Sequence, residues 1–109
     1  METAYRDEVP SRAEVDAMPG PVLVEFGADW CPHCQSIQPH LQSALERHPA
    51  VRHIKVADGK GKPLGRSFRV KLWPNLVFLR DGQVVKQSAR PAPSEVEAGL
   101  AAITDAAAR

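Results

Sequence analysis

The only two cysteines in the chain lie three positions apart, at Cys31 and Cys34 in the segment DWCPHCQ. A single CxxC pair in a reducing compartment is more often catalytic or metal-binding than a structural disulfide. If Cys31 ends a strand and Pro32 opens a helix, Cys31 is the N-cap, where unpaired N–H groups and the helix dipole stabilise a thiolate. The sequence therefore predicts a nucleophilic Cys31, with Cys34 one turn further in and able to attack a mixed disulfide at Cys31.

The two residues between the cysteines, Pro32 and His33, are expected to tune this chemistry. A positive charge or a hydrogen bond from the imidazole of His33 would favour the thiolate of Cys31 and so the reduced form. A more stable reduced form makes the couple more oxidising. The alternative is a solvent-exposed His33 without such a role.

Glu25 is a lone carboxylate in the apolar run VLVEF, just before the cysteines. Burial in such a run is expected to raise its pKa, which suits a general base that takes the proton of Cys34. The alternative is an outward-facing Glu25 at a margin of the sheet.

The elements that must position these residues can be predicted from hydrophobic periodicity and turn residues. The apolar run at 22–27 is typical of a central strand covered on both faces. Pro39 lies inside the next predicted helix, where it should cause a kink. In chain order we expect helix 11–17, strand 22–27, helix 32 to about 48, strand 51–57, helix 64–70, strands 75–80 and 83–87, and helix 95 to about 107.

Capping and turn signals support several of these boundaries. Ser11 with Glu14, and Ser94 with Glu97, each have the capping-box pattern that opens a helix. The dipeptide Asp81-Gly82 predicts a tight hairpin between the last two strands. We therefore expect those two strands to pair antiparallel.

The order of the elements indicates an α/β fold. Helices alternate with strands early and a hairpin follows late, which implies a mixed central sheet of four to five strands flanked by helices on both faces. A fifth strand would come from residues 4–6. The length of 109 residues suits one domain over 1–109 with a single core.

Charge and hydropathy exclude several classes of function. A net charge of +1 gives no basis for general binding to nucleic acid or acidic membrane, and the apolar runs are too short for a membrane helix. The first residues lack the pattern of a signal peptide, so we expect a cytoplasmic location if Met1 is the natural start. Seven of the fourteen basic residues lie between Arg52 and Lys71, either as a solvated surface or as a patch that steers an acidic partner.

Two segments resemble the thioredoxin family. VLVEFGADWCPHC is similar to its active-site strand and turn, and LWPNLVFLRDGQVV is similar to its later segment; the match covers roughly Val22 to Val85. The resemblance implies the thioredoxin fold, with Pro74 as a cis-proline packed against the cysteines. It also places Glu25 where the family usually has a buried aspartate that moves the proton of the inner cysteine. The residues Trp30, Trp73 and Pro74 would then bind substrate, with the backbone of Trp73 offered to an extended substrate strand.

Four residues depart from the family pattern. Pro32-His33 replaces the Gly-Pro of thioredoxins and resembles the oxidising DsbA-type proteins. Trp73 is bulkier than the aliphatic residue usual before the cis-proline, and Arg90 falls near a common glycine of the substrate-facing loop. The last two changes lie on the expected binding surface, so the resemblance does not carry the partner set of thioredoxins over to this chain.

The leading interpretation is an enzyme, a thioredoxin-like protein-disulfide reductase that acts through Cys31 and Cys34 and is more oxidising than thioredoxins with Cys-Gly-Pro-Cys. We expect no cofactor and a monomer. Its partners would be disulfide-containing proteins and an electron-donating reductase or glutathione system. One alternative is a binding adaptor or chaperone that uses the groove around Trp30, Trp73 and Pro74. Another is a metal site bridged between two chains, since one CxxC supplies only two of four ligands.

Overall fold

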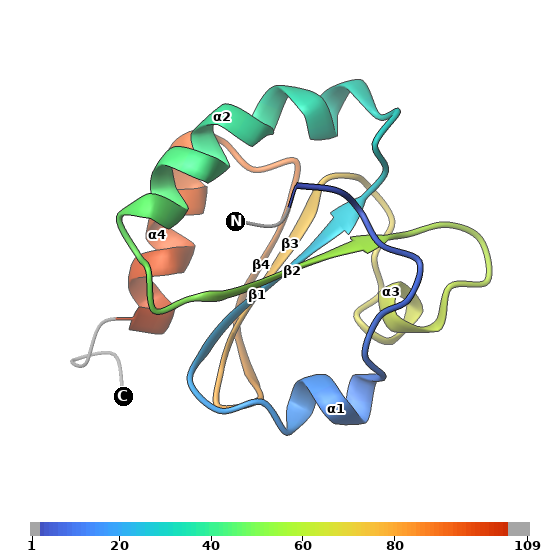
Figure 1. The fold of residues 1–109 in the computed structure, drawn as a ribbon, viewed down its shortest axis with the longest axis horizontal. Coiled ribbons are helices and arrows are strands. Elements are labelled where there is room, and N and C mark those ends of the chain that lie inside the picture. The colour runs from blue at the N-terminus through green and yellow to red at the C-terminus, as the bar shows by residue number, and fades with distance from the viewer. Residues whose placement is uncertain (1–2, 105–109) are drawn as a thin grey trace.

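The centre of the structure, a computed structural model that describes residues 3–104, is a four-stranded sheet in the order β2-β1-β3-β4 (Figure 1). Its strands are β1 (Pro21–Gly27), β2 (Arg52–Ala57), β3 (Asn75–Arg80) and β4 (Gln83–Ala89). β1 pairs in parallel with β2 and antiparallel with β3, and β3 pairs antiparallel with β4. The predicted mixed sheet is thereby confirmed.

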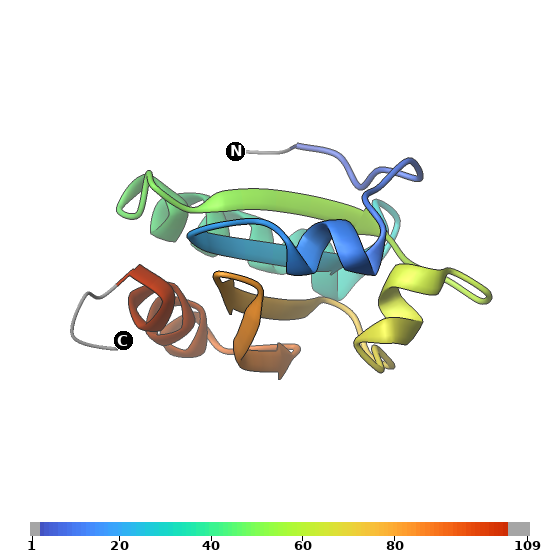
Figure 2. The same cartoon turned by 90° about the horizontal axis from the view of Figure 1, so that it is seen from below.

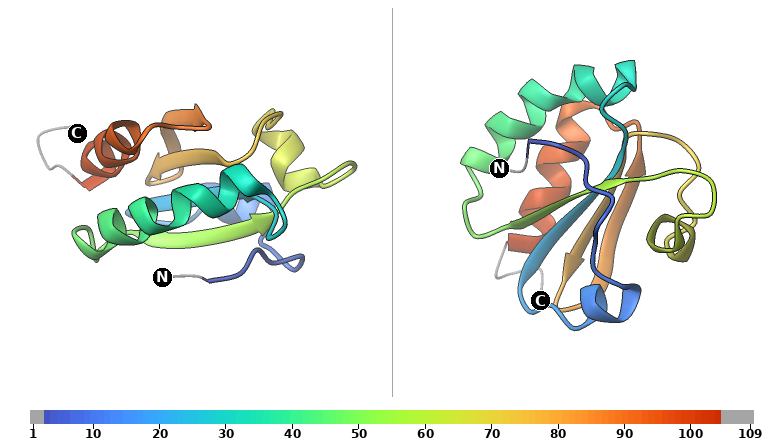
Figure 3. Two further views of the ribbon diagram at one scale, coloured as in Figure 1. Left: turned by 90° about the horizontal axis from the view of Figure 1, so that it is seen from above. Right: turned by 45° about the vertical axis from the view of Figure 1, so that its right-hand side comes forward.

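Four helices cover the sheet, two on each face. They are α1 (Arg12–Asp16), α2 (Pro32–Glu46), α3 (Pro63–Ser67) and α4 (Pro93–Thr104). Figure 2 shows α1 and α3 on one side of the strands, and Figure 3 shows α2 and α4 on the other. The predicted end of the last helix near Ala107 lies outside the described residues. Within the described part of the chain, no helix has the length and apolar composition needed to cross a membrane.

Side-chain alternation along β1 divides the core into two halves. Val22, Val24 and Phe26 pack with residues of α1 and α3, whereas Leu23 packs with residues of α2 and α4. Because side chains alternate along a strand, Glu25 lies on the same face as Leu23, under α2. The strand thus delivers one carboxylate to the side of the sheet from which the cysteines come.

The segment before α1 lies along β2 (Figure 3). The predicted fifth strand is a single parallel bridge between Arg6 and Val56. In this bridge the backbone N–H of Ala57 donates to the carbonyl of Arg6 at 2.8 Å, and that of Arg6 donates to Lys55 at 3.2 Å. The bridge holds the neighbouring Tyr5 in a small buried cluster with both cysteines.

The two capping-box predictions had different outcomes. The box of Ser11 and Glu14 is confirmed, with both of its hydrogen bonds formed. The box of Ser94 and Glu97 is wrong, because α4 begins earlier, at Pro93, a residue favoured in the first turn since its missing N–H has no partner to lose. Glu95 accepts the hydrogen bond from the backbone of Ala92 instead, at 3.0 Å.

Other boundaries shift for local reasons. The helix predicted at 64–70 is α3, which ends at Ser67, and Arg69 shortly after it has a left-handed φ of 57°. Asp81 and Gly82 both have positive φ, 50° and 78°, which confirms the tight turn between β3 and β4. Pro39 lies inside α2, and Figure 1 shows that this helix is bent.

Candidate active site

The N-terminus of α2 positions the two thiols. Cys31 is the N-cap of the helix, with an extended backbone, and Pro32 occupies the first turn. The sulfur of Cys31 accepts a hydrogen bond from the backbone N–H of Cys34 at 3.4 Å. Both cysteines are free thiols in this structure. An N-cap sulfur in this position faces the positive end of the helix dipole, which favours a thiolate.

Cys34 is the more buried of the two cysteines. It is 1% exposed, against 5% for Cys31. Burial, together with a hydrogen bond to Cys31, raises the pKa of the Cys34 thiol to about 11. Cys34 is therefore protonated at neutral pH, and its attack on another sulfur requires a group that takes its proton.

Glu25 is fully buried and surrounded by hydrogen-bond donors. It accepts hydrogen bonds from the hydroxyl of Tyr5, from Nε2 of Gln38 at 2.8 Å and from Nε2 of His53 at 2.8 Å. Burial by itself raises the pKa of Glu25, but the hydrogen bonds from His53 and Tyr5 and the attraction of His53 and Lys55 together lower it. The predicted rise in its pKa is therefore wrong, and Glu25 is ionised at neutral pH.

A lysine completes the buried cluster. Lys55 is 2% exposed, and its Nζ donates to Oε1 of Gln38 at 2.9 Å and lies 4.3 Å from the ring centroid of Tyr5. Gln38 also donates to the carbonyl of Cys34 at 2.9 Å, so it connects Lys55, Glu25 and the helix that carries the cysteines.

Sequence reasoning missed Tyr5, Gln38, His53 and Lys55 as members of the site. A signal for two of them was present, because His53 and Lys55 alternate along β2 and so share a face. Lys55 is also the parallel partner of Glu25 in the sheet. Tyr5 had no such signal, since it precedes every regular element and is held at the site by the bridge to β2 and by a hydrogen bond from its backbone N–H to Asp29.

Two tryptophans form the rim beside the cysteines. Trp30 is 73% exposed, and its ring meets that of Trp73 edge-on with centroids 5.7 Å apart. The indole N–H of Trp73 donates to Asp58 at 2.8 Å, which fixes the ring. The peptide bond between Trp73 and Pro74 is cis. The rim thus combines one freely exposed aromatic ring with one that is held in place.

Arg90 covers the backbone next to Pro74. Its own N–H donates to the carbonyl of Pro74 at 2.7 Å, and its Nε donates to the carbonyl of Trp73 at 2.8 Å. Arg90 has a left-handed φ of 48°. The carbonyl of Trp73, which we expected to be open to a substrate strand, is therefore occupied by the side chain of Arg90.

His33 is exposed and lines a surface cavity of about 310 Å³ together with Pro74 and Arg90. Its carbonyl accepts a hydrogen bond from the hydroxyl of Ser36 at 3.1 Å. The imidazole therefore lies on the surface beside the predicted rim.

The described residues also bear on the metal alternative and on the basic segment. Among residues 3–104, no three His, Cys, Asp or Glu side chains come together as ligands for one ion. The basic segment from Arg52 to Lys71 is divided, because Lys55 is buried in the site while Lys62 forms an exposed ion pair with Asp7 at 3.1 Å. The seven basic residues are therefore not one continuous surface patch.

Comparison with known proteins gives consistent matches. Residues 2–102 match the family model for thioredoxin. This chain is similar to the structure of thioredoxin 2 from Pseudomonas aeruginosa PAO1 in its reduced form, with 51% sequence identity and a TM-score of 0.81. The match covers 94% of this chain and 96% of the thioredoxin 2 chain.

Two curated relatives match shorter stretches. Thioredoxin-3, mitochondrial, from Saccharomyces cerevisiae is 28% identical over 72% of this chain and 62% of its own length. Protein disulfide-isomerase from Hordeum vulgare is 42% identical over 56% of this chain and 13% of its own length. The chain thus spans less than two thirds of these curated relatives.

Proposed function

The chain belongs to the thioredoxin family, and from this we propose that it is a thiol–disulfide oxidoreductase that exchanges its Cys31/Cys34 dithiol with disulfides of protein substrates. One observation carries the proposal: two free thiols lie three positions apart at the N-terminus of α2, the sulfur of Cys31 accepts a hydrogen bond from the backbone N–H of Cys34, and Cys34 is buried behind it. This arrangement separates an attacking sulfur from a resolving sulfur.

The reaction proceeds in two exchanges. The thiolate of Cys31 attacks a substrate disulfide, forms a mixed disulfide, and the first substrate sulfur leaves as a thiolate. Cys34 then loses its proton and attacks the sulfur of Cys31, so the second substrate sulfur leaves with its electron pair. Two electrons pass from the dithiol to the substrate, and Cys31 and Cys34 become a disulfide. An electron-donating reductase or the glutathione system restores the dithiol.

Glu25 acts as the base for the resolving step. It is ionised at neutral pH and therefore free to accept a proton, although its lowered pKa makes it a weak base. Pro32 and His33 tune the reactivity of Cys31 from the other side. The couple is expected to lie above that of Cys-Gly-Pro-Cys thioredoxins, within the range from about −270 mV in thioredoxin to about −120 mV in DsbA.

The substrate lies across Trp30, Trp73 and Pro74 as an extended segment. Trp30 offers exposed apolar surface beside the attacking sulfur. The side chain of Arg90 already donates to the carbonyl of Trp73, so a substrate N–H that binds there must share this acceptor with Arg90 or displace it. Substrate proteins that present an acceptor for Arg90 would therefore bind in preference to others.

We expect electrons to flow from the dithiol to the substrate disulfide, which agrees with the cytoplasmic location predicted from the sequence.

The direct test is a redox titration of the Cys31/Cys34 pair across glutathione buffers at neutral pH, read as the fraction of thiol that can be alkylated. A single two-electron transition is expected. Cys31→Ser should lose all disulfide reductase activity, and Cys34→Ser should accumulate the mixed disulfide.

Different results would favour the other functions. If no intramolecular disulfide forms at any poise, the exchange proposal fails. Function retained after both cysteines are changed to serine would favour the adaptor or chaperone. Stoichiometric metal in the purified protein would favour a site bridged between two chains.

A further inference from the structure

The buried carboxylate of Glu25 connects two regions through its two oxygens. Oε2 accepts the hydroxyl of Tyr5 and the amide of Gln38, whereas Oε1 lies 2.8 Å from Nε2 of His53. Tyr5 lies on the cysteine side of Glu25, and His53 lies on the other. If Oε2 of Glu25 gains a proton, the imidazole of His53 beside Oε1 can lose one, and the total charge of the network stays the same.

Tyr5 lies between Glu25 and the resolving thiol. Its hydroxyl donates to the carboxylate of Glu25 and lies close to the sulfur of Cys34, since both approach the backbone of Gly27. The contact requires glycine at position 27, because a Cβ there would lie 2.6 Å from the sulfur of Cys34 and 2.8 Å from the hydroxyl of Tyr5. Burial and the neighbouring Glu25 raise the pKa of Tyr5, so its hydroxyl keeps a proton to pass on.

His53 forms the other end of the network. Its side chain is 5% exposed, and its Nδ1 is buried without a hydrogen-bond partner in residues 3–104. The ring lines a surface cavity of about 500 Å³ between the end of α2 and the start of β2, which Leu45, His48 and Val51 also line. A buried ring nitrogen without a partner is rare in folded proteins and calls for a role.

We propose that Tyr5, Glu25 and His53 form a proton path from the thiol of Cys34 to the cavity beside Val51. The inference rests on the proposed exchange reaction and adds its proton exit. Cys34 is 1% exposed, and a substrate on the Trp30 rim covers it further, so the proton cannot reach water from the front of the site. The proposed path instead carries the proton to the cavity between the end of α2 and the start of β2.

Each proton in this path is accounted for. The path starts from the ion pair that the 2.8 Å contact allows, a carboxylate at Glu25 and an imidazolium at His53. During the resolving step Cys34 passes its proton to the oxygen of Tyr5 while Tyr5 passes its own proton to Oε2 of Glu25. Neutral Glu25 no longer stabilises the charge on His53, whose ring lines the cavity and releases one proton toward it. Because Nδ1 is buried, this release needs a small movement of the ring or the entry of one water. One proton enters the network and one leaves it, and reduction of the disulfide reverses the sequence.

Among residues 3–104, a further ionisable group that faces the path is Lys55, on β2, while Glu46 and His48 line the cavity at its end. Its Nζ is engaged with Gln38 and with the face of the Tyr5 ring, and it does not bridge the thiol and the carboxylate. Its positive charge helps to keep Glu25 ionised. Lys55 therefore sets the charge state of the path, and Tyr5, Glu25 and His53 carry the proton.

The test follows the two sulfur steps separately in a single turnover with 5,5′-dithiobis(2-nitrobenzoate). The first release of coloured thiolate reports attack by Cys31, and the second reports resolution by Cys34. Tyr5→Phe and His53→Gln are expected to slow the second release about tenfold or more at neutral pH and to leave the first unchanged. The loss should shrink as pH rises toward the Cys34 pKa of about 11, because a growing fraction of Cys34 is then already a thiolate and needs no base.

The matched control is His48→Gln. His48 lines the same cavity and also pairs with a glutamate, but it makes no contact with Glu25 in the described network. Both releases should match those of the unaltered chain. Imidazole added to His53→Ala should restore the second release by entering the cavity, and it should not rescue Tyr5→Phe, whose break lies on the other side of Glu25.

Two outcomes would overturn the path. In the first, the rate of the second release in Tyr5→Phe and His53→Gln equals that of the unaltered chain at every pH. In the second, these variants slow both releases equally. Solvent deuterium in the unaltered chain gives a check that needs no variant, since it should slow the second release and not the first. An unaltered chain that never gives a second release refutes the proposed function itself, so the two failures are distinguishable.

Discussion

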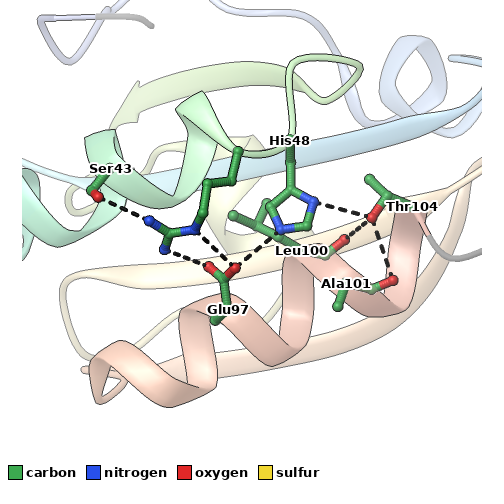
Figure 4. A network of polar contacts seen from close by, with 7 residues as sticks. Ser43, His48, Glu97, Leu100, Ala101 and Thr104 are labelled. Atoms are coloured by element: carbon green, nitrogen blue, oxygen red, sulfur yellow. Dashed lines mark hydrogen bonds and ion pairs between the residues drawn. The ribbon is translucent and has the colours of Figure 1, made fainter.

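Two glutamate–histidine pairs in this molecule have the same chemistry in opposite surroundings. Glu25 and His53 are joined at 2.8 Å, with side chains 0% and 5% exposed. Glu97 on α4 is 41% exposed and lies 3.3 Å from Nε2 of His48 (Figure 4). A hydrogen bond from Arg47 lowers the pKa of Glu97, so both glutamates are carboxylates at neutral pH.

The surface pair ties helices together. Figure 4 shows Glu97 of α4 beside His48, which follows α2. Arg47, the residue before His48, donates to Glu97 at 3.0 Å. Nδ1 of His48 lies 3.3 Å from the hydroxyl of Thr104, so both ring nitrogens have partners. In the buried pair Nδ1 of His53 has none among the described residues. The surface pair is thus a structural contact, and the unpartnered ring nitrogen of the buried pair is the feature on which the proposed proton path rests.

The largest expected difference between the pairs is in stability. Glu25→Ala leaves His53 and Lys55 buried without their carboxylate and is expected to lower the free energy of unfolding by about 3–5 kcal/mol. Glu97→Ala should lose less than about a third of that, because water screens an exposed pair. Urea unfolding followed by tryptophan fluorescence measures both, and equal losses would show that burial does not separate the pairs.

A steric change should disturb the buried cluster without removing a charge. Gly27→Ala places a Cβ against the sulfur of Cys34 and the hydroxyl of Tyr5 and is expected to cost about 1–3 kcal/mol. Gly59→Ala is the control, since its Cβ would meet only Lys62, at 3.9 Å. Thermal unfolding of both variants tests the difference. If the stability of Gly27→Ala equals that of the unaltered chain, Tyr5 is not held against Cys34.

Acid should affect the buried pair more than the surface pair. The pKa of Glu25 is lowered from its unfolded value of about 4.3, so its carboxylate stabilises the fold above that pH. This contribution is lost as pH falls through the lower folded-state pKa. Glu25→Gln is therefore expected to flatten the decrease in unfolding free energy below about pH 4.3, and Glu97→Gln to change it less. Identical acid profiles would contradict this prediction.

Salt should produce the smallest effect and only at the surface. The loss of stability in Glu97→Gln is expected to shrink in about 1 M NaCl, where the screening length is about 3 Å. The loss in Glu25→Gln should persist, because ions do not reach a carboxylate that is 0% exposed. Unfolding midpoints in low and high salt measure this, and a salt-sensitive Glu25→Gln would show that water enters the cluster.

Local sequence predicted most of the fold. The apolar run of β1, the proline after Cys31 and the Asp81-Gly82 turn each act within a few residues, and all three appear as predicted. The failed capping box at Ser94 has a local cause too, since Pro93 competes for the same helix start. Boundaries fail where two local signals overlap.

The sequence by itself determined the two thiols, their spacing and their place at a helix N-terminus, because these depend on neighbours along the chain. Only the tertiary structure decided the state of Glu25. Its pKa depends on Tyr5 and His53, which lie 20 and 28 positions away in the sequence. Electrostatic interactions act through space and over a few ångströms, so the charges and donors around a buried group follow from packing that no single segment encodes.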